Sequence, residues 1–341
     1  MERKTTLKEL AKILNVSIST VSKALNDSSE INPDTKARVK EVALANNYVP
    51  NELAQSLKGK KTKTLGVIIP EVLSQFFAKS LHGIETMASS LGYKIIICIS
   101  NESVQKETES LNILVNTNVD GIIMSLARET QATESYDHFK KVFDYGIPIV
   151  LFDRVSDTLV CDKITVNDRE ITHKAAMELH NSGCKNIIYL STIYDTSVDK
   201  QRQIGYTSAM KELRSKPEIL HIKDYTYFEE NLLKVLKKSN VDGIVAADEL
   251  SAISAMKTAL NHGYRIPEDL SVIGFTNGVL GENFIPSLTT VEQYAEEQGR
   301  TAVELIIGRI QKTIAAEPVH RIIKTSILHR NSTRQSLALQ K

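Results

Sequence analysis

Seven short apolar runs constrain the fold of this 341-residue chain more than any other feature. In order they read LGVIIP, KIIICIS, DGIIMSL, IPIVLFD, NIIYLS, DGIVAAD and LSVIGF, and amphipathic stretches such as FAKSLHGIETMASSLG precede or follow them. Apolar runs of this length are typical of buried parallel strands, because helices cover both faces of a parallel sheet. From Thr64 onward the sequence therefore predicts an α/β doubly wound fold in which each run is a buried strand.

The alternation occurs twice. VDGIIMS at 119–125 and VDGIVAA at 241–247 are near copies, as expected for two similar halves. Parallel sheets bind ligands beyond the carboxyl ends of their strands. We therefore expect a ligand site between the two halves.

The first 49 residues have a different pattern, which predicts three short helices around one small core. The first helix has an apolar stripe at i, i+3, i+4 and i+7, a turn at 15–17 follows, and the third helix runs from Pro33 to about Asn46–Asn47. The predicted core residues are Leu7, Leu10, Ala11, Leu14, Val21, Ala24, Leu25, Val39, Val42 and Ala43. This arrangement is a helix-turn-helix followed by a supporting helix.

The second of these helices lies in VSISTVSKALN (16–26), which is rich in hydroxyl side chains. Such residues favour turns and caps over helix interiors. With Val21, Ala24 and Leu25 facing inward, the outer face and N-terminus carry Ile18, Ser19, Thr20, Ser22 and Lys23. Short donors and acceptors on a helix can approach base edges in a major groove, and a lysine can contact phosphate or guanine. The alternative is a surface helix that is merely rich in serine.

Charge supports contact between this head and a polyanion. Residues 1–64 carry 12 Lys or Arg against 7 Asp or Glu, a net charge of +5, whereas the remainder carries 30 against 34, a net charge of −4. A basic head on a mildly acidic body is typical of nucleic-acid binding, although ordinary surface variation is the alternative reading.

Composition excludes several other classes. The longest apolar runs are far shorter than the roughly 18 residues of a membrane span, and no charged-then-apolar leader precedes Thr5, so we expect no membrane partner and no secretion. The three isolated cysteines, Cys98, Cys161 and Cys184, lack metal-site spacing and indicate a reducing cytoplasm. We interpret them as small core residues and expect no metal and no cofactor.

Three separated motifs resemble the lactose repressor (LacI/GalR) family of transcriptional regulators. They are VSISTVSKALN, the junction YVPNELAQSLKGKKTKTLGVIIP at 48–70 and DLSVIGFTNGVLGENFIPSLTTV at 269–291, and the likeness extends from Thr6 to about Thr333. The resemblance implies a small all-α helix-turn-helix DNA-binding domain (1–49) and a hinge helix with linker (50–63). An α/β two-subdomain periplasmic-binding-protein-like core (64–333) and a short tail (334–341) would follow.

In the family the chain crosses three times between the two subdomains of this core. The crossings would lie near Asp162, Leu288 and Pro318. Subdomain 1 would then comprise about 64–161 plus 289–318, and subdomain 2 about 162–288 plus 319–333. Hinged closure of two such halves is a known switching device.

For DNA, the resemblance implies an operator-binding homodimer whose hinge helix folds over DNA. The hinge leucine at Leu57 would insert between base pairs of the minor groove, and Ala54 would allow the two hinge helices to approach closely. The basic linker GKKTK would contact phosphates. The expected DNA-binding residues are Thr6, Ser17, Ile18, Ser19, Thr20, Ser22, Lys23, Asn26, Asn51, Ala54, Leu57 and Lys60.

For the effector, the resemblance implies a sugar-like small molecule in the cleft between the subdomains. The expected contacts are Phe76, Phe77, Ser125, Asp153, Arg202, Tyr225, Asp248 and Thr276. An arginine fork beside an aromatic face suits a polyhydroxylated ring or a small anion. Core packing is the alternative for Phe76 and Phe77, and a surface ion pair is the alternative for Arg202.

The chain departs from the family pattern at two strand ends. Thr276 and Asn277 stand where the family usually has an aspartate after GF, and Ala247 stands where many members have Asn before the strand-end aspartate. Both changes remove groups that commonly hold sugar hydroxyls, which argues against an unmodified neutral hexose. An unusual, phosphorylated or acidic sugar, a purine-like ligand and a protein coeffector remain as alternatives.

The function that follows is a sequence-specific regulator, usually a repressor in this family, that binds a pseudo-palindromic operator as a cytoplasmic, nucleoid-associated homodimer under effector control. A dimer is favoured over a tetramer because QSLALQK lacks sustained heptads. An α/β enzyme is the rival class, but no GxSxG, GxGxxG, P-loop or HExxH motif occurs. We therefore expect no catalytic residues.

Overall fold

The computed structural model describes residues 5–48 and 61–334. The chain divides into two compact units, Met1–Thr62 and Lys63–Lys341, which are described separately. Most of the predicted hinge and linker, from 50 to 60, lies outside the described residues.

The N-terminal unit contains three helices, α1 (Leu7–Leu14), α2 (Ile18–Leu25) and α3 (Pro33–Ala45). Each begins at a polar N-cap, and at Thr6 the side chains of Thr6 and Glu9 form a reciprocal capping box. Seven apolar side chains are buried between the helices: Leu10, Ala11, Leu14, Val21, Ala24, Val39 and Ala43. The predicted three-helix core is confirmed, although Leu7, Leu25 and Val42 are only partly buried at its edge.

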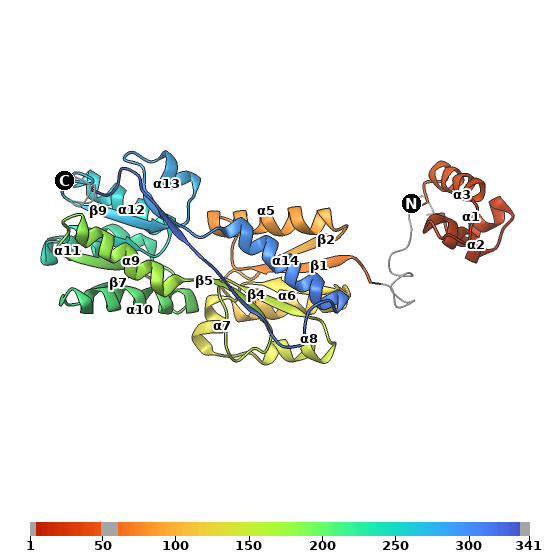
Figure 1. Ribbon diagram of the computed structural model, residues 1–341, viewed down its shortest axis with the longest axis horizontal. Helices are drawn as coiled ribbons and strands as arrows, with labels where there is room; N and C mark the ends of the chain where they lie inside the picture. Colours follow the sequence, from red (N-terminus) through yellow and green to blue (C-terminus); the bar gives the residue numbers. More distant parts are fainter. Residues whose placement is uncertain (1–4, 49–60, 335–341) are drawn as a thin grey trace. The chain divides into compact units, whose positions relative to one another are not determined.

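The first half of the core is a six-stranded parallel sheet in the order β11-β5-β4-β3-β1-β2. Its strands are β1 (Thr64–Ile69), β2 (Lys94–Ile99), β3 (Gly121–Met124), β4 (Ile149–Phe152), β5 (Asp162–Val166) and β11 (His320–Ile323). Its helices are α5 (Gln75–Ser90), α6 (Val104–Asn116), α7 (Arg128–Thr133), η1 (Asp137–Phe139), α8 (Lys140–Asp144) and α14 (Ala295–Gln311). Helices α5 and α14 pack together on one face, and α6 covers the other (Figure 1).

The second half has a sheet in the order β12-β10-β9-β8-β6-β7, in which only β12 is antiparallel to its neighbour. Its strands are β6 (Ile187–Ser191), β7 (Ile219–His221), β8 (Gly243–Ala246), β9 (Ser271–Phe275), β10 (Thr289–Glu292) and β12 (Ser326–Leu328). Its helices are α9 (Asp168–Asn181), α10 (Ser197–Glu212), η2 (Tyr225–Tyr227), α11 (Phe228–Ser239), α12 (Glu249–Asn261) and α13 (Val279–Asn283). Helices α9 and α10 cover one face of this sheet, and α11 and α12 cover the other.

The predicted positions of the three crossings are wrong by about one strand each. β5 and β11 belong to the first sheet, and β10 belongs to the second. The chain therefore crosses after Val166, after Glu292 and after Ile323 rather than near Asp162, Leu288 and Pro318. The reason is that each segment completes a ladder of backbone hydrogen bonds with its original sheet before leaving it.

One predicted strand differs from expectation in its burial. KIIICI forms β2 at the sheet edge, where it pairs with β1 alone. The side chains of Ile97 and Ile99 are 44% and 38% exposed. The prediction of a fully buried strand is wrong here, because an edge strand has a neighbour on one side only.

The cysteine prediction is confirmed for two of the three residues. Cys161 and Cys184 are buried, whereas Cys98 lies on the edge strand and is partly buried. Among the helices within 5–48 and 61–334, none has the length and apolar character needed to cross a membrane.

Candidate DNA-binding helix and effector site

Two of the hydroxyl side chains in the stretch 16–26 stabilise the start of α2. Ser17 is the N-cap, and its Oγ accepts a hydrogen bond of 3.0 Å from the backbone N–H of Thr20. The Ser17 and Thr20 hydroxyl oxygens also lie 2.8 Å apart, within hydrogen-bonding distance. Capping explains why these two positions are polar.

The remaining polar residues of α2 do not serve as N-caps. Val21 and Ala24 are fully buried, whereas Ile18 is 48% exposed and Ser19 is exposed. Lys23 forms an ion pair with Glu30. Both side chains of this pair are exposed, and such pairs contribute little to stability, so Lys23 can exchange Glu30 for another anion.

The other predicted DNA-binding residues have local roles or lie outside the described residues. Asn26 is the C-cap of α2, and its Nδ2 donates to the Ser22 carbonyl at 2.7 Å. Thr6 is the N-cap of α1. The predicted hinge contacts Asn51, Ala54, Leu57 and Lys60 fall outside the described residues.

In the core, a buried cluster joins Asp153 of the first half to Arg202 of the second. Arg202 Nε donates to Asp168 Oδ1 at 2.7 Å, its Nη1 donates to the Ala247 carbonyl, and its guanidinium lies 3.8 Å from the Phe275 ring centroid. Arg202 is 2% exposed, so the alternative of a surface ion pair is wrong. Its Nη2 has no hydrogen-bond partner among the described residues.

The carboxyl group of Asp153 follows β4 at a backbone φ of 59° and is nearly buried. Burial raises its pKa to about 6, while the nearby charges of Arg154 and Arg202 act in the opposite direction. Asp153 can therefore change its protonation state close to neutral pH.

Arg154, the next residue, was not predicted as a site residue. Its Nη1 donates to both carboxylate oxygens of Glu102, at 2.8 and 2.6 Å, and its guanidinium lies 5.6 Å from the Phe77 ring centroid. Glu102 Oε2 also accepts the backbone N–H of Arg128 at 2.7 Å. Glu102 follows β2, Arg128 follows β3 and Arg154 follows β4, so these hydrogen bonds connect the ends of three strands.

A second group surrounds Tyr225. Its hydroxyl lies 3.5 Å from Thr192 Oγ1, which donates to Asp248 Oδ2 at 2.6 Å, and its ring stacks on Phe228. Burial raises the pKa of Tyr225, and the charges of Asp248 and then Glu71 raise it further. Glu71, which follows β1, is also influenced by Glu102 and Arg154, so it lies close enough to connect the two groups electrostatically.

Three predicted effector residues pack against or bind other groups of the protein. Phe76 and Phe77 are buried in the core of the first half. Thr276 Oγ1 donates to Gln293 Oε1 at 2.8 Å. Ser125 is also fully buried, yet its Oγ has no hydrogen-bond partner among the described residues. Ligand contact by these four remains a prediction.

A cavity of about 910 Å³ lies beside the crossing strands. Both halves line it, through residues 153–157, 165–170 and 320–324 and through α10. Of the eight predicted effector residues it includes only Asp153, so it does not coincide with the predicted site. The groups around Arg154 and Tyr225 form the candidate effector site instead, because their polar side chains converge from the strand ends.

Five residues of these groups were not predicted from the sequence: Glu71, Glu102, Arg154, Asp168 and Thr192. For some of them the sequence does contain a usable signal. Glu71, Arg154 and Thr192 lie within two residues of a strand end, where ligands bind in this fold. Asp168 also lies two residues past a strand, but that strand, β5, was not among the predicted apolar runs, and its pairing with Arg202 joins positions 34 apart in sequence. No group of three or more His, Cys, Asp or Glu with metal-site geometry occurs in the described part of the chain.

A helix-turn-helix unit joined to a two-sheet α/β core defines a class of DNA-binding regulators, and comparisons with known proteins identify the family. Residues 6–51 match the model of the bacterial regulatory proteins of the lacI family, and residues 176–333 match the periplasmic binding protein-like domain. The transcriptional regulator RegA of Clostridium saccharobutylicum is 30% identical over 338 residues, covering 96% of this chain and 99% of RegA. Catabolite control protein A of Priestia megaterium is 30% identical, covering 97% and 98%.

The fold matches solved structures over the same extent. The lac repressor dimer bound to operator and an anti-inducer has a TM-score of 0.85 at 21% identity, covering 97% of this chain and 99% of that one. The regulator CelR in complex with cellobiose has a TM-score of 0.70 at 23% identity, covering 96% and 100%. The chain belongs to the LacI family of transcriptional regulators, as its motifs predicted, and it is a DNA-binding regulator rather than an enzyme.

Proposed function

We propose that the protein is a cytoplasmic homodimeric repressor that binds a pseudo-palindromic operator and is controlled by a sugar or sugar derivative bound between the halves of its core. The observation that carries the DNA-binding half of this proposal is α2. Val21 and Ala24 anchor the helix in its core, while Ile18 and Ser19 remain exposed for base edges. The proposed contacts are those predicted from the sequence, including Leu57 in the hinge.

The operator test begins with selection of bound duplexes from a random pool. A pseudo-palindromic consensus is the expected result, and Lys23→Ala should reduce the salt slope of operator binding by nearly one if Lys23 contacts phosphate. Lys257→Ala, at an exposed lysine of α12, is the control and should leave the slope unchanged. Recovery of no preferred sequence would contradict the proposal.

Two surfaces of the core support a homodimer. The edge strand β2 exposes Ile97 and Ile99, and the region of α13 exposes Val279, Leu280 and Ile285, which is 86% exposed. Exposed apolar residues of this kind mark interaction sites. A two-fold dimer also matches the symmetry of a palindromic operator. Sedimentation at micromolar concentration should give twice the chain mass of 38.0 kDa, and a monomer would contradict the dimer.

The charge pairing of the site favours an uncharged polyhydroxylated ligand. Arg154 and Arg202 are already bound by Glu102 and Asp168, so a phosphate would have to displace a carboxylate from one of them. Ligand hydroxyls can instead donate to the carboxylates and accept from the free guanidinium N–H groups. The Arg154–Glu102 pair would then supply polar contacts that Thr276 and Ala247 do not. Similar structures contain cellobiose and D-xylulofuranose, which is consistent with this class.

A thermal-shift screen of sugars, sugar phosphates, acidic sugars and purines tests the effector. A ligand at about 100 times its Kd stabilises the folded state by roughly 2.7 kcal/mol. A sugar that also changes operator affinity supports the proposal, and Arg154→Met should abolish its effect. Arg265→Met, in the exposed pair with Asp269, is the matched control. A response to a purine alone, or no response, would contradict a sugar or sugar derivative as the effector, and no response would favour a protein coeffector. A response to a phosphorylated sugar alone would contradict only the uncharged ligand class.

A further inference from the structure

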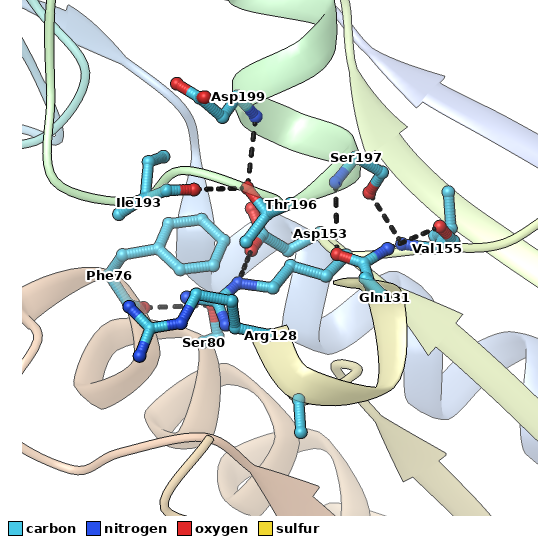
Figure 2. Close-up of polar contacts among 12 residues, drawn as sticks. Phe76, Ser80, Arg128, Gln131, Asp153, Val155, Ile193, Thr196, Ser197 and Asp199 are labelled. Carbon is cyan, nitrogen blue, oxygen red and sulfur yellow. Dashed lines mark hydrogen bonds and ion pairs between the residues drawn. The ribbon is translucent and has the colours of Figure 1, made fainter. Parts of the chain in front are cut away.

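Three residues form a closed set of hydrogen bonds between the two halves of the core (Figure 2). Gln131 of α7 donates from Nε2 to the Val155 carbonyl at 2.8 Å and accepts the Ser197 backbone N–H at 3.0 Å. The Val155 backbone N–H in turn donates to Ser197 Oγ at 3.1 Å. Gln131 and Val155 belong to the first half, whereas Ser197 begins α10 of the second.

The amide of Gln131 is well placed to hold the halves together. Gln131 is 5% exposed, so its two hydrogen bonds are protected from competing water. One bond stays within the first half and the other crosses to the second. Opening of the halves would break two of the three bonds and leave the amide oxygen without its partner.

The helix that carries Gln131 is firmly anchored in the first half. Glu107 of α6 is fully buried, and its carboxylate accepts hydrogen bonds at the start of α7 from the Ala127 N–H at 2.6 Å and from the Thr130 hydroxyl at 2.7 Å. Its Oε1 also lies 2.8 Å from His138 Nε2. Gln131 therefore projects from a fixed support, and movement of α10 has to change its distance to Ser197.

The same three residues are adjacent to the proposed effector contacts. Val155 directly follows Asp153 and Arg154, and Ser197 lies five positions before Arg202 on α10. The distance between β4 and α10 thus determines how the charged groups of the first half face Arg202.

We propose that Gln131 is a positioning residue that holds the two halves in the closed arrangement and so aligns Asp153 and Arg154 with Arg202. This inference rests on the proposed function of that site. Gln131 acts through Val155 and Ser197 and does not itself need to touch the ligand.

The test measures the distance between the halves in the full chain. Spin labels are attached to Lys106→Cys on α6 and Lys237→Cys on α11, both exposed positions, in a Cys98→Ser background. Excess unlabelled chain restricts the pulsed-dipolar signal to labels within one protomer. Neither operator nor effector is added, so failure of the proposed DNA or ligand binding cannot produce or hide the result.

Gln131→Met preserves side-chain length and removes two hydrogen bonds, and Ser197→Ala removes the third. Only one of the two bonds lost in Gln131→Met crosses between the halves. At a net contribution of about 1 kcal/mol per crossing bond, the ratio of closed to open forms should fall roughly fivefold in Gln131→Met and roughly 30-fold in the double variant. Gln131→Glu keeps an acceptor for Ser197 and should give an intermediate ratio. Thr133→Val on the same helix removes a hydrogen bond to Glu129 within the first half and should leave the distances unchanged.

A distance distribution in the folded double variant that matches the wild type would overturn the proposal. So would an equal change in Thr133→Val, because that would indicate general loosening of α7. Circular dichroism of each variant establishes that it is folded before the distances are compared.

Discussion

Equivalent strands of the two halves end in the same backbone geometry with different chemistry. β4 ends at Phe152 and β9 ends at Phe275, and the next residues, Asp153 and Thr276, have φ values of 59° and 76°. The backbone N–H of each donates to the neighbouring strand, to Ile164 at 2.9 Å and to Val291 at 3.0 Å. The fold therefore imposes the same left-handed turn at both positions.

The side chains use this turn in different ways. Aspartate tolerates the left-handed region, and Asp153 places a carboxyl group near Arg154 and Arg202. Threonine is β-branched and strained there, and the Thr276 hydroxyl is bound to Gln293 beside a crossing segment. The first half therefore keeps an ionisable group at its strand end, whereas the second half uses the same position to bind its own crossing segment.

The largest effects on stability are expected where two helices are in backbone contact. They test whether the two halves pack their helices equally closely. A Cβ on Gly83 of α5 would lie 2.1 Å from the Glu296 carbonyl oxygen, and one on Gly205 of α10 would lie 2.2 Å from that of Arg169. Because these neighbours are backbone atoms, the helices would have to separate. We expect Gly83→Ala and Gly205→Ala each to lower the free energy of unfolding by about 3 kcal/mol in urea titrations.

Gly308→Ala on α14 is the matched control for both. A Cβ there would lie 3.0 Å from a side-chain carbon of Ile314, which can move. Since alanine is also favoured over glycine in a helix by about 1 kcal/mol, little net change is expected. If Gly83→Ala is as mild as this control while Gly205→Ala is not, the halves differ in packing as well as in chemistry.

The architecture was predictable because apolar runs alternate with amphipathic stretches throughout the core. The crossings were not, because β5, β10 and β11 carry no local signal of which sheet they join. That choice depends on hydrogen bonds to strands far away in sequence, such as the pairing of His320 with Lys163. The exposure of β2 was unpredictable for the same reason, because a single apolar run does not show whether its strand lies at the centre or at the edge of a sheet.

For the site, the sequence predicted which residues lie at strand ends, but it did not predict which side chains they contact. The resemblance to the family implied that Asp153 and Thr276, which each follow a strand, both face the ligand. Their different environments come from Arg154, Arg202 and Gln293, whose side chains the sequence alone does not orient. Hydroxyl-rich α2 shows the same division. Its outward face and a capping hydroxyl in the turn at 15–17 were predicted, whereas the partner of that cap, the backbone N–H of Thr20, required the helix boundary.

Replacement of Asp153 by asparagine should change how the free energy of unfolding depends on pH. The folded-state pKa of about 6 lies above the ordinary aspartate value of about 3.9, so the stability contribution of this group is fully present below about pH 4 and is lost as pH rises through about 6. Asp153→Asn cannot ionise and retains a residue that tolerates the turn. At pH 7.5 we expect it to be more stable than the wild type by about 2 kcal/mol, with the difference shrinking towards pH 4.

Urea titrations of both proteins between pH 4 and 7.5 measure this difference directly. The matched control is Asp195→Asn, at an exposed aspartate with a φ of 62°. This control shows what the exchange of aspartate for asparagine does by itself at an exposed left-handed position. A pH dependence for Asp153→Asn no larger than that of the control would mean that the Asp153 carboxyl group is not a buried, ionisable group at the end of β4.

The smallest effects are expected at Thr276, where two substitutions should have opposite signs. Thr276→Asn replaces a β-branched residue in the left-handed region and keeps a donor for Gln293, so it should raise the free energy of unfolding by about 1 kcal/mol. Thr276→Val keeps the strained shape and leaves the buried Gln293 oxygen without its donor, so it should lower that free energy by about 1 kcal/mol. Equal changes in both would mean that neither the turn nor the hydrogen bond distinguishes this strand end from that of Asp153.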